Sequence, residues 1–338
     1  MTVYPQFLNL VRLIQTLFCF TVSLALVCIR TIMNFWVSTD RCEDEDDLVC
    51  EYDSTWDMED TESDSDEDNS TGRTTVCGGG LTRFFSKTVA KDTYHYGYSW
   101  RRNTQAAKDM QNYRRGYPDE ARYRQYLGMA EEEENMANLQ FYLNKKRSEP
   151  DGVYIDEFHQ DWNGHYEKLE RVHSYIQWLF PLQEPGMNYM AQELTMMEIE
   201  AFCNNEKAKQ RLLTSYKMML DFYGITLVNK ETGEVKRSAN WEKRFENLNR
   251  YTHNNLRITR ILKCLGELGF PHYQAPLVQF FLEETLVHKN LDRVKQSVLD
   301  YFLFAVRDKE QRRKLIEFAF EHYQRNDEFV WKYPGVRG

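Results

Sequence analysis

The sequence lacks the short motifs that mark most catalytic and cofactor sites. It contains no Walker A loop, no Gly-x-Gly-x-x-Gly, no Gly-x-Ser-x-Gly and no His-Glu-x-x-His. Its eight histidines are scattered, and the nearest two, His159 and His165, are spaced so that a helix would turn them away from each other. These absences predict a protein that is not an enzyme, with no catalytic residues, no metal site and no cofactor.

Cysteine is also scarce, and its spacing suggests no pairing. Seven cysteines are present without a Cys-x-x-Cys pair, and only Cys203 and Cys264 lie in the C-terminal two thirds of the chain. This pattern argues against a disulfide framework and against the common zinc sites. It indicates that the folded part faces a reducing compartment.

The formal net charge of −9 is concentrated in one segment. Residues 40–68 hold 16 carboxylates and one base, Arg41, which leaves 42 basic and 36 acidic residues elsewhere. An excess of six positive charges outside this segment is modest, so nucleic acid is not expected as a partner.

The N-terminus, residues 1–38, is apolar. Leu13 to Ile29 form a run of 17 residues without charge, which is the lower limit for a helix that spans a bilayer. We predict a single-pass membrane anchor through residues 13–29, followed by a cytosolic domain. Two alternatives stay open: a cleaved signal peptide with its processing site at 23–25, and a buried or interfacial helix.

Residues 39–97 are predicted to form a disordered acidic linker. The carboxylate run, its interspersed Ser and Thr, and the glycine triplet at 78–80 supply too few apolar side chains for a core. Thr61, Ser63 and Ser65 each precede a carboxylate by three positions, a pattern typical of acid-directed kinase sites. We predict these three residues as phosphosites, and the alternative is a plain solvated spacer.

Residues 98–333 show the periodicity of an all-α domain. Apolar side chains recur at helical spacing from Leu212 to Tyr223, from Ile258 to Leu265 and from Leu291 to Ala305. Glycines 224 and 269 follow the first two of these segments and supply their stops. The pattern predicts a single compact helical domain.

Three further signals refine this expectation. Asp308 and Gln311 are spaced as a capping box that opens another helix. Residues 131–147 form a further helical candidate. The one strand signal, residues 225–235 with Thr232-Gly233 as the turn, predicts a small β-hairpin.

Two stretches are dense enough in aromatic or basic residues to act as recognition surfaces. Residues 173–181, interpreted as a helix, contain Tyr175 and Trp178, which are favoured anchors for a bound peptide. Core packing of Trp178 and its neighbour Phe180 is the commoner role for such residues.

The second stretch, residues 250–263, carries a basic stripe of Arg257, Arg260 and Lys263 at intervals of three. Such a stripe suits an acidic partner. The alternatives are a solvated helix face or ion pairs with Glu283 and Glu284.

Several long strings in this part of the chain are distinctive. They include HSYIQWLFPLQEPGMN at 173–188, HNNLRITRILK at 253–263 and FFLEETL at 280–286. Together they closely resemble the conserved domain of the opioid growth factor receptor family, over about residues 98–332. Ordered strings of this length are far more specific than a spaced motif.

The resemblance implies a receptor for the opioid growth factor, the pentapeptide Met-enkephalin, that restrains cell growth at the nuclear envelope or in the nucleus. The sequence departs from the family pattern by ending at Gly338, without a long C-terminal tail, and by its apolar N-terminus. We therefore expect a membrane-tethered, receptor-like member that binds the peptide. The alternative is a helical protein–protein interaction adaptor without affinity for opioid peptides.

A site for this peptide needs a carboxylate for its amine, an aromatic wall and an arginine for its C-terminal carboxylate. The residues of the right types are Glu283, Glu284, Tyr175, Trp178, Arg257 and Arg260. We expect them to converge, and burial in separate parts of the core would argue against the site.

Overall fold

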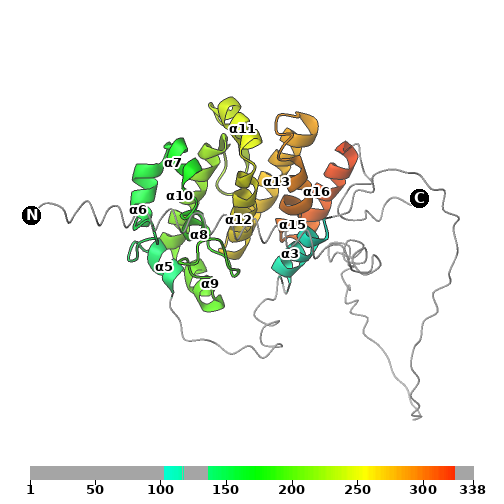
Figure 1. Ribbon diagram of the computed structural model, residues 1–338. Helices are drawn as coiled ribbons and strands as arrows, with labels where there is room; N and C mark the ends of the chain where they lie inside the picture. The colour runs from blue at the N-terminus through cyan, green and yellow to red at the C-terminus, as the bar shows by residue number, and fades with distance from the viewer. Residues whose placement is uncertain (1–102, 116, 118–135, 324–338) are drawn as a thin grey trace, which may run out of the picture. The chain divides into compact units, whose positions relative to one another are not determined.

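Helices supply almost all the regular structure of the computed structural model, which describes residues 103–115, 117 and 136–323 (Figure 1). The predicted membrane anchor at 13–29, the acidic linker and the phosphosites Thr61, Ser63 and Ser65 lie outside the described residues. The prediction of an all-α domain with one small hairpin is confirmed for the described part.

The N-terminal half of this part is built from short helices around one long one. The long helix, α10 (Glu206–Phe222), begins at Asn205, whose side chain accepts from the Ala208 amide, and it stops before Gly224. The shorter elements around it are α5 (Ala137–Tyr142), α6 (Ile155–Glu157), η2 (Phe158–Trp162), α7 (Tyr166–Arg171), α8 (Ile176–Leu179) and α9 (Met196–Cys203). Helix α3 (Thr104–Arg114) precedes them in the sequence but packs against the C-terminal half.

The C-terminal half stacks further helices beside α10 (Figure 1). Its central helix is α12 (His253–Glu267), whose apolar face is the predicted one. The other elements are α11 (Trp241–Arg250), η3 (Pro271–Tyr273), α13 (Gln274–Leu282), η4 (Glu283–Val287), α14 (Lys295–Ser297), η5 (Val298–Phe302), α15 (Leu303–Ala305) and α16 (Lys309–His322).

The hairpin joins the two halves. Strand β1 (Ile225–Leu227) pairs antiparallel with β2 (Val235–Arg237), and Thr226 lies opposite Lys236. Gly233 in the connection has a φ of 78°, a conformation that glycine adopts without steric cost. The predicted hairpin is confirmed, and its second strand extends two residues beyond the predicted end at Val235.

Three helix predictions need correction. The helix predicted at 131–147 is helical in its described part only over α5, and Asn144 beyond it has a positive φ of 61°. The segment 291–305 is helical only from Lys295, and it passes through a π-helical turn, η5. The segment 173–181 forms only the single turn α8, because Phe180 leaves the helical conformation at φ −136°.

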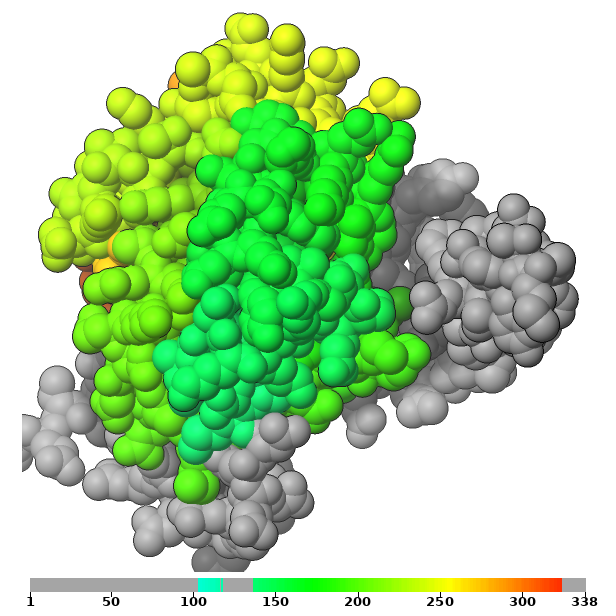
Figure 2. Space-filling view, turned by 90° about the vertical axis from the view of Figure 1, so that its left-hand side faces the viewer, coloured from blue at the N-terminus to red at the C-terminus, as the bar shows by residue number. Residues whose placement is uncertain are grey.

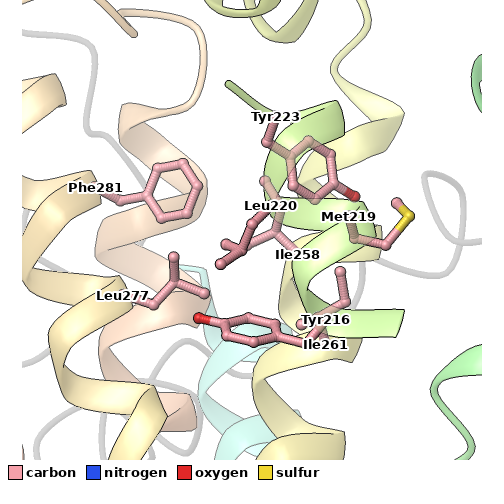
Figure 3. A pocket seen from close by; sticks show the side chains of 8 residues that line it. All are labelled: Tyr216, Met219, Leu220, Tyr223, Ile258, Ile261, Leu277 and Phe281. Atoms are coloured by element: carbon pink, nitrogen blue, oxygen red, sulfur yellow. The ribbon is translucent and has the colours of Figure 1, made fainter. Parts of the chain in front are cut away.

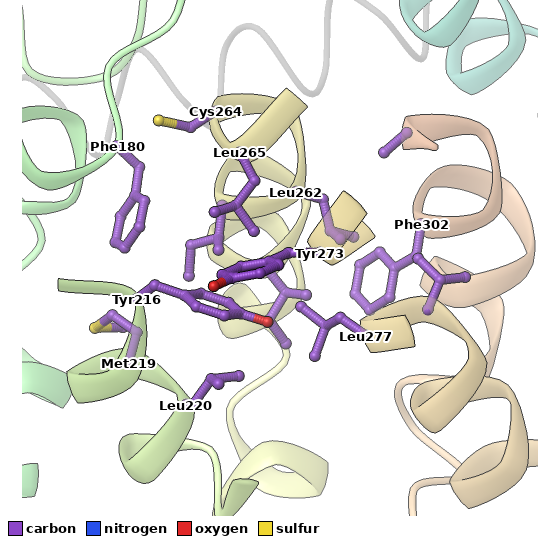
Figure 4. Packing of buried hydrophobic residues seen from close by; sticks show 14 of the residues in the cluster. Phe180, Tyr216, Met219, Leu220, Leu262, Cys264, Leu265, Tyr273, Leu277 and Phe302 are labelled. Carbon is purple, nitrogen blue, oxygen red and sulfur yellow. The ribbon is translucent and has the colours of Figure 1, made fainter. Parts of the chain in front are cut away.

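The N-cap at Asp308 is confirmed: its carboxylate accepts from the Gln311 amide at 2.7 Å and opens α16. One continuous hydrophobic core runs through both halves. In it the rings of Tyr216 on α10 and Tyr273 on η3 stack with centroids 5.5 Å apart (Figure 4). Aromatic side chains therefore fill the space between elements that are short and irregular.

Candidate functional site

The two stretches singled out as recognition surfaces contact each other. Arg257 on α12 is 5% exposed, and its guanidinium donates to the carbonyls of Leu169 at 2.8 Å and Val172 at 2.9 Å. The same guanidinium lies over the ring of Tyr175, 5.5 Å from its centroid. A buried cation is tolerated here because polar acceptors and an aromatic face surround it.

The rest of the basic stripe continues this contact along α12. Arg260 donates through Nε to the carbonyl of Phe180 at 2.7 Å, and Lys263 Nζ lies 2.7 Å from a carboxylate oxygen of Glu184. The stripe is therefore neither a solvated face nor paired with Glu283 and Glu284. It binds the chain that runs from α7 past α8 to the following loop.

The two aromatic candidates belong to the core. Tyr175 is fully buried and donates through its hydroxyl to the Leu169 carbonyl at 2.9 Å. Trp178 is also fully buried, and its indole nitrogen donates to the carbonyl of Glu149 at 2.9 Å. These contacts match the core-packing role, which the sequence left open beside peptide contact.

The two acidic candidates lie on η4, after α13. Glu284 is 3% exposed, and its carboxylate accepts from Arg237 at 2.6 and 2.8 Å and from Asn290 at 2.9 Å. Glu283 is half-buried and accepts from Gln279 at 2.8 Å.

The structure thus brings Arg257 and Tyr175 together, but it does not assemble the six candidates into an open site. Four of them, Tyr175, Trp178, Arg257 and Glu284, are buried with their polar atoms engaged inside the protein. Their role in ligand binding stays a prediction, and it would require these internal contacts to open.

A polar cluster beside Arg257 was missed by the sequence reasoning. Glu170, at the end of α7, accepts from Asn247 at 2.6 Å and from Asn254 at 3.2 Å, and lies 2.7 Å from His253 Nε2. Partial burial and then the charge of Arg257 lower the pKa of His253. The cluster joins α7 to α11 and α12, which follow it by about 70 residues or more in the sequence, so local spacing does not indicate it.

A cavity of about 10 Å³ lies between α10, α12 and α13 (Figure 3). Such a volume holds one water molecule at most, so it is far too small for a pentapeptide. Its lining is apolar apart from two phenol groups, whose hydroxyls have no hydrogen-bond partner in the described structure. The residues around it are Tyr216, Met219, Leu220, Tyr223, Ile258, Ile261, Leu277 and Phe281.

No three His, Cys, Asp or Glu side chains in 103–115, 117 and 136–323 converge as metal ligands. Within the same residues, no helix combines the length and apolar character needed to cross a bilayer.

Together these features define a helical domain in which a basic helix, α12, holds an aromatic segment against the core. Residues 131–335 match the region described as the opioid growth factor receptor (OGFr) conserved region. The chain belongs to the opioid growth factor receptor family.

Curated relatives agree with this assignment. The chain is 54% identical over 230 residues to the opioid growth factor receptor of Mus musculus and 52% identical over 232 residues to that of Homo sapiens. It is 49% identical over 236 residues to the opioid growth factor receptor-like protein 1 of Mus musculus.

The alignments cover 68%, 68% and 69% of this chain and 35%, 33% and 49% of these relatives. The chain therefore spans between a third and a half of their length. No solved structure matches it.

Proposed function

We propose that this protein is a non-catalytic, membrane-tethered binding protein that takes Met-enkephalin as its ligand and takes part in restraining cell growth. The observation that carries the proposal is the identity of 49–54% to proteins named for the opioid growth factor. The apolar run at residues 13–29 supports the tether.

The surroundings of a serine–histidine contact in the described residues support a role without catalysis. His159 Nε2 lies 2.9 Å from the hydroxyl oxygen of Ser215, a spacing that also occurs in hydrolases. Ser215 is fully buried, and burial lowers the pKa of His159 to about 4. A substrate has no access to this hydroxyl, so the pair is best understood as a hydrogen bond within the core.

Titration calorimetry of the full chain with Met-enkephalin tests the ligand. We expect binding at micromolar concentrations, and an N-acetylated peptide should bind more weakly because it lacks the ammonium group that a carboxylate would hold. Glu283→Gln should reduce affinity if Glu283 is that carboxylate, with exposed Glu310→Gln as the matched control. Absence of heat at micromolar peptide would contradict the proposal.

A second candidate function is a protein–protein interaction adaptor without opioid peptide affinity. It is favoured by the burial of Tyr175, Trp178, Arg257 and Glu284, and by exposed side chains such as Tyr189, which is 84% exposed. The same titration separates the two functions, since the adaptor gives no heat with Met-enkephalin.

The tether is tested by the localisation of a tagged chain with and without residues 1–37. We expect the full chain at membranes and the shortened chain in the cytosol. The alternative location of the full chain is the nuclear envelope or the nucleus. A shortened chain that stays in the membrane fraction would show that residues 13–29 are not the anchor.

A further inference from the structure

The N-terminal half of the described part forms the face shown in Figure 2. Within this half, a compact loop follows α8. It spans residues 183–193, and its ends meet where the Leu194 amide donates to the Leu182 carbonyl at 2.9 Å. Leu182 and Leu194 are 2% and 4% exposed, so both ends are anchored in the core. The segment has the properties of an Ω-loop, a class that is frequently functional.

Asn188 fixes the middle of this loop. Its backbone exchanges hydrogen bonds in both directions with the side-chain amide of Gln177. Its own amide nitrogen donates to the carbonyls of Glu149 at 2.7 Å and Ser174 at 3.1 Å. Gly186 packs so closely that a Cβ there would overlap the Gln177 side chain. These contacts hold the loop in one conformation.

The rigid loop displays two large apolar side chains to solvent. Met187 and Tyr189 flank the inward-facing Asn188 and are 78% and 84% exposed. Met197, in the first turn of α9, is 42% exposed, and Met190 is half-buried. Methionine and tyrosine are favoured at binding surfaces because they adapt in shape and offer large contact area.

The segment that carries these side chains is acidic. Residues 181–206 contain five glutamates and no lysine, arginine or histidine. Glu184 is paired with Lys263 and Glu198 is buried, whereas Glu193 and Glu200 are exposed. Glu200 follows Met197 by three positions on α9, so the two share one face of that helix.

We propose that this Met–Tyr surface, formed by Met187, Tyr189 and Met197 with Glu193 and Glu200, docks a basic amphipathic helix of a partner protein. The apolar face of such a helix covers the methionines and the tyrosine, and its lysines or arginines meet the two carboxylates. The surface shares no residue with the candidate site for Met-enkephalin, whose acidic members are Glu283 and Glu284.

Fluorescence anisotropy of the full chain with a labelled Leu/Lys amphipathic peptide of about 18 residues tests the surface. The double variant Met187→Ser, Tyr189→Ser should weaken binding by tenfold or more. The control variant Val228→Ser, Leu256→Ser removes exposed apolar side chains elsewhere and should leave affinity unchanged. Glu193→Gln with Glu200→Gln should weaken binding by about threefold and reduce its dependence on salt.

The acidic run at residues 40–68 is present in every variant and attracts any cation, so a second peptide is needed. A peptide of the same composition, reordered to have no apolar face, measures that background. Stronger binding of the amphipathic peptide, lost in the Met187→Ser, Tyr189→Ser chain, supports the proposal. Equal binding of both peptides overturns it, and so does an equal loss of affinity in the control variant. Absence of binding at micromolar peptide also overturns it. Thermal melting confirms that each variant is folded.

Discussion

Arg257 connects two distant parts of the chain. Its hydrogen bond to the Val172 carbonyl joins residues that are 85 positions apart in the sequence. It carries its charge into the interior and satisfies backbone carbonyls where α7 ends and the chain turns toward α8. The planar guanidinium reaches several acceptors at once, which an ammonium group at the end of a flexible chain cannot do. A positive charge in this place acts as a structural connector.

Arg257→Lys should therefore destabilise the protein, although the charge is kept. Carbonyls of Leu169 or Val172 would lose their donor inside the protein, at a cost of about 2–4 kcal/mol. Urea unfolding measures the loss. Arg250→Lys, at an exposed position near the end of α11, is the control and should change the free energy of unfolding by less than about 0.5 kcal/mol. Equal effects of the two changes would contradict this role of Arg257.

His159 makes stability depend on pH. Burial lowers its pKa from 6.5 to about 4, so between these values the unfolded chain binds a proton that the folded protein does not. The free energy of unfolding should therefore rise with pH across this window and fall as pH drops from about 6.5 toward 4.

His159→Asn should flatten this dependence by an amount on the order of 3 kcal/mol between the two ends of the window. Chemical unfolding at a series of pH values measures it. His165→Asn changes an exposed histidine just before α7 and should leave the slope as it is. A wild-type slope in the His159→Asn protein would show that other groups cause the dependence.

At the scale of elements, the end of α10 is set by a close approach to α11. Gly224 has a φ of 81°, and a Cβ there would lie 2.8 Å from Arg244 Cβ and 2.9 Å from Trp241 Cα. The glycine therefore serves two purposes: it permits the left-handed conformation, and it leaves room for the backbone of the next helix.

Gly224→Ala and Gly164→Ala separate these two purposes. Gly164 has a similar φ of 77° but open space around it, so alanine there should cost only the conformational penalty of about 1–2 kcal/mol. Gly224→Ala should cost about 1–3 kcal/mol more, because the clash adds to it. Thermal or urea unfolding of both variants measures the difference, and equal losses would exclude the clash.

The whole described part shares one core, which should make its unfolding cooperative. The N-terminal aromatic cluster, including Trp162, Tyr175 and Trp178, belongs to the same continuous set of buried residues as Phe302 in η5. Stacking of Tyr216 on Tyr273 is one of the links between the halves (Figure 4). Loss of packing in one half should therefore be felt in the other.

Phe302→Ala should destabilise both halves together, by about 3–5 kcal/mol. Near-UV circular dichroism reports aromatic packing and far-UV circular dichroism reports helix, and both melting curves should shift by the same amount. Val287→Ala, at a side chain that is 46% exposed, is the control and should shift neither curve appreciably. Two separate transitions in the variant would mean that the halves unfold independently.

Periodicity predicted the long helices well because each buries one continuous apolar face. The segments from Leu212 and from Ile258 lie in α10 and α12 as expected. Periodicity predicted the segment 291–305 less well. Leu291 and Val294 are fully buried in the turns before α14, and buried positions outside a helix follow no helical repeat. The turn at Phe180 was missed for the same reason.

The candidate site was harder to predict than the helices. The sequence identified Arg257, Arg260 and Lys263 as a stripe, but not that its partners are Leu169, Phe180 and Glu184. Residue type shows what a side chain is able to bind, and only packing shows which partner reaches it first. Glu284 illustrates this, because its carboxylate is already paired with Arg237 of the hairpin.

By itself, the sequence determined the helical class, the hairpin, the cap at Asp308 and the family, since these depend on local spacing and on long ordered strings. The tertiary structure alone decided that the aromatic and basic stretches bind each other, and that Met187 and Tyr189 remain outside. The physical reason is that burial and hydrogen bonding are settled between segments distant in the chain, where local pattern carries no information about the partner.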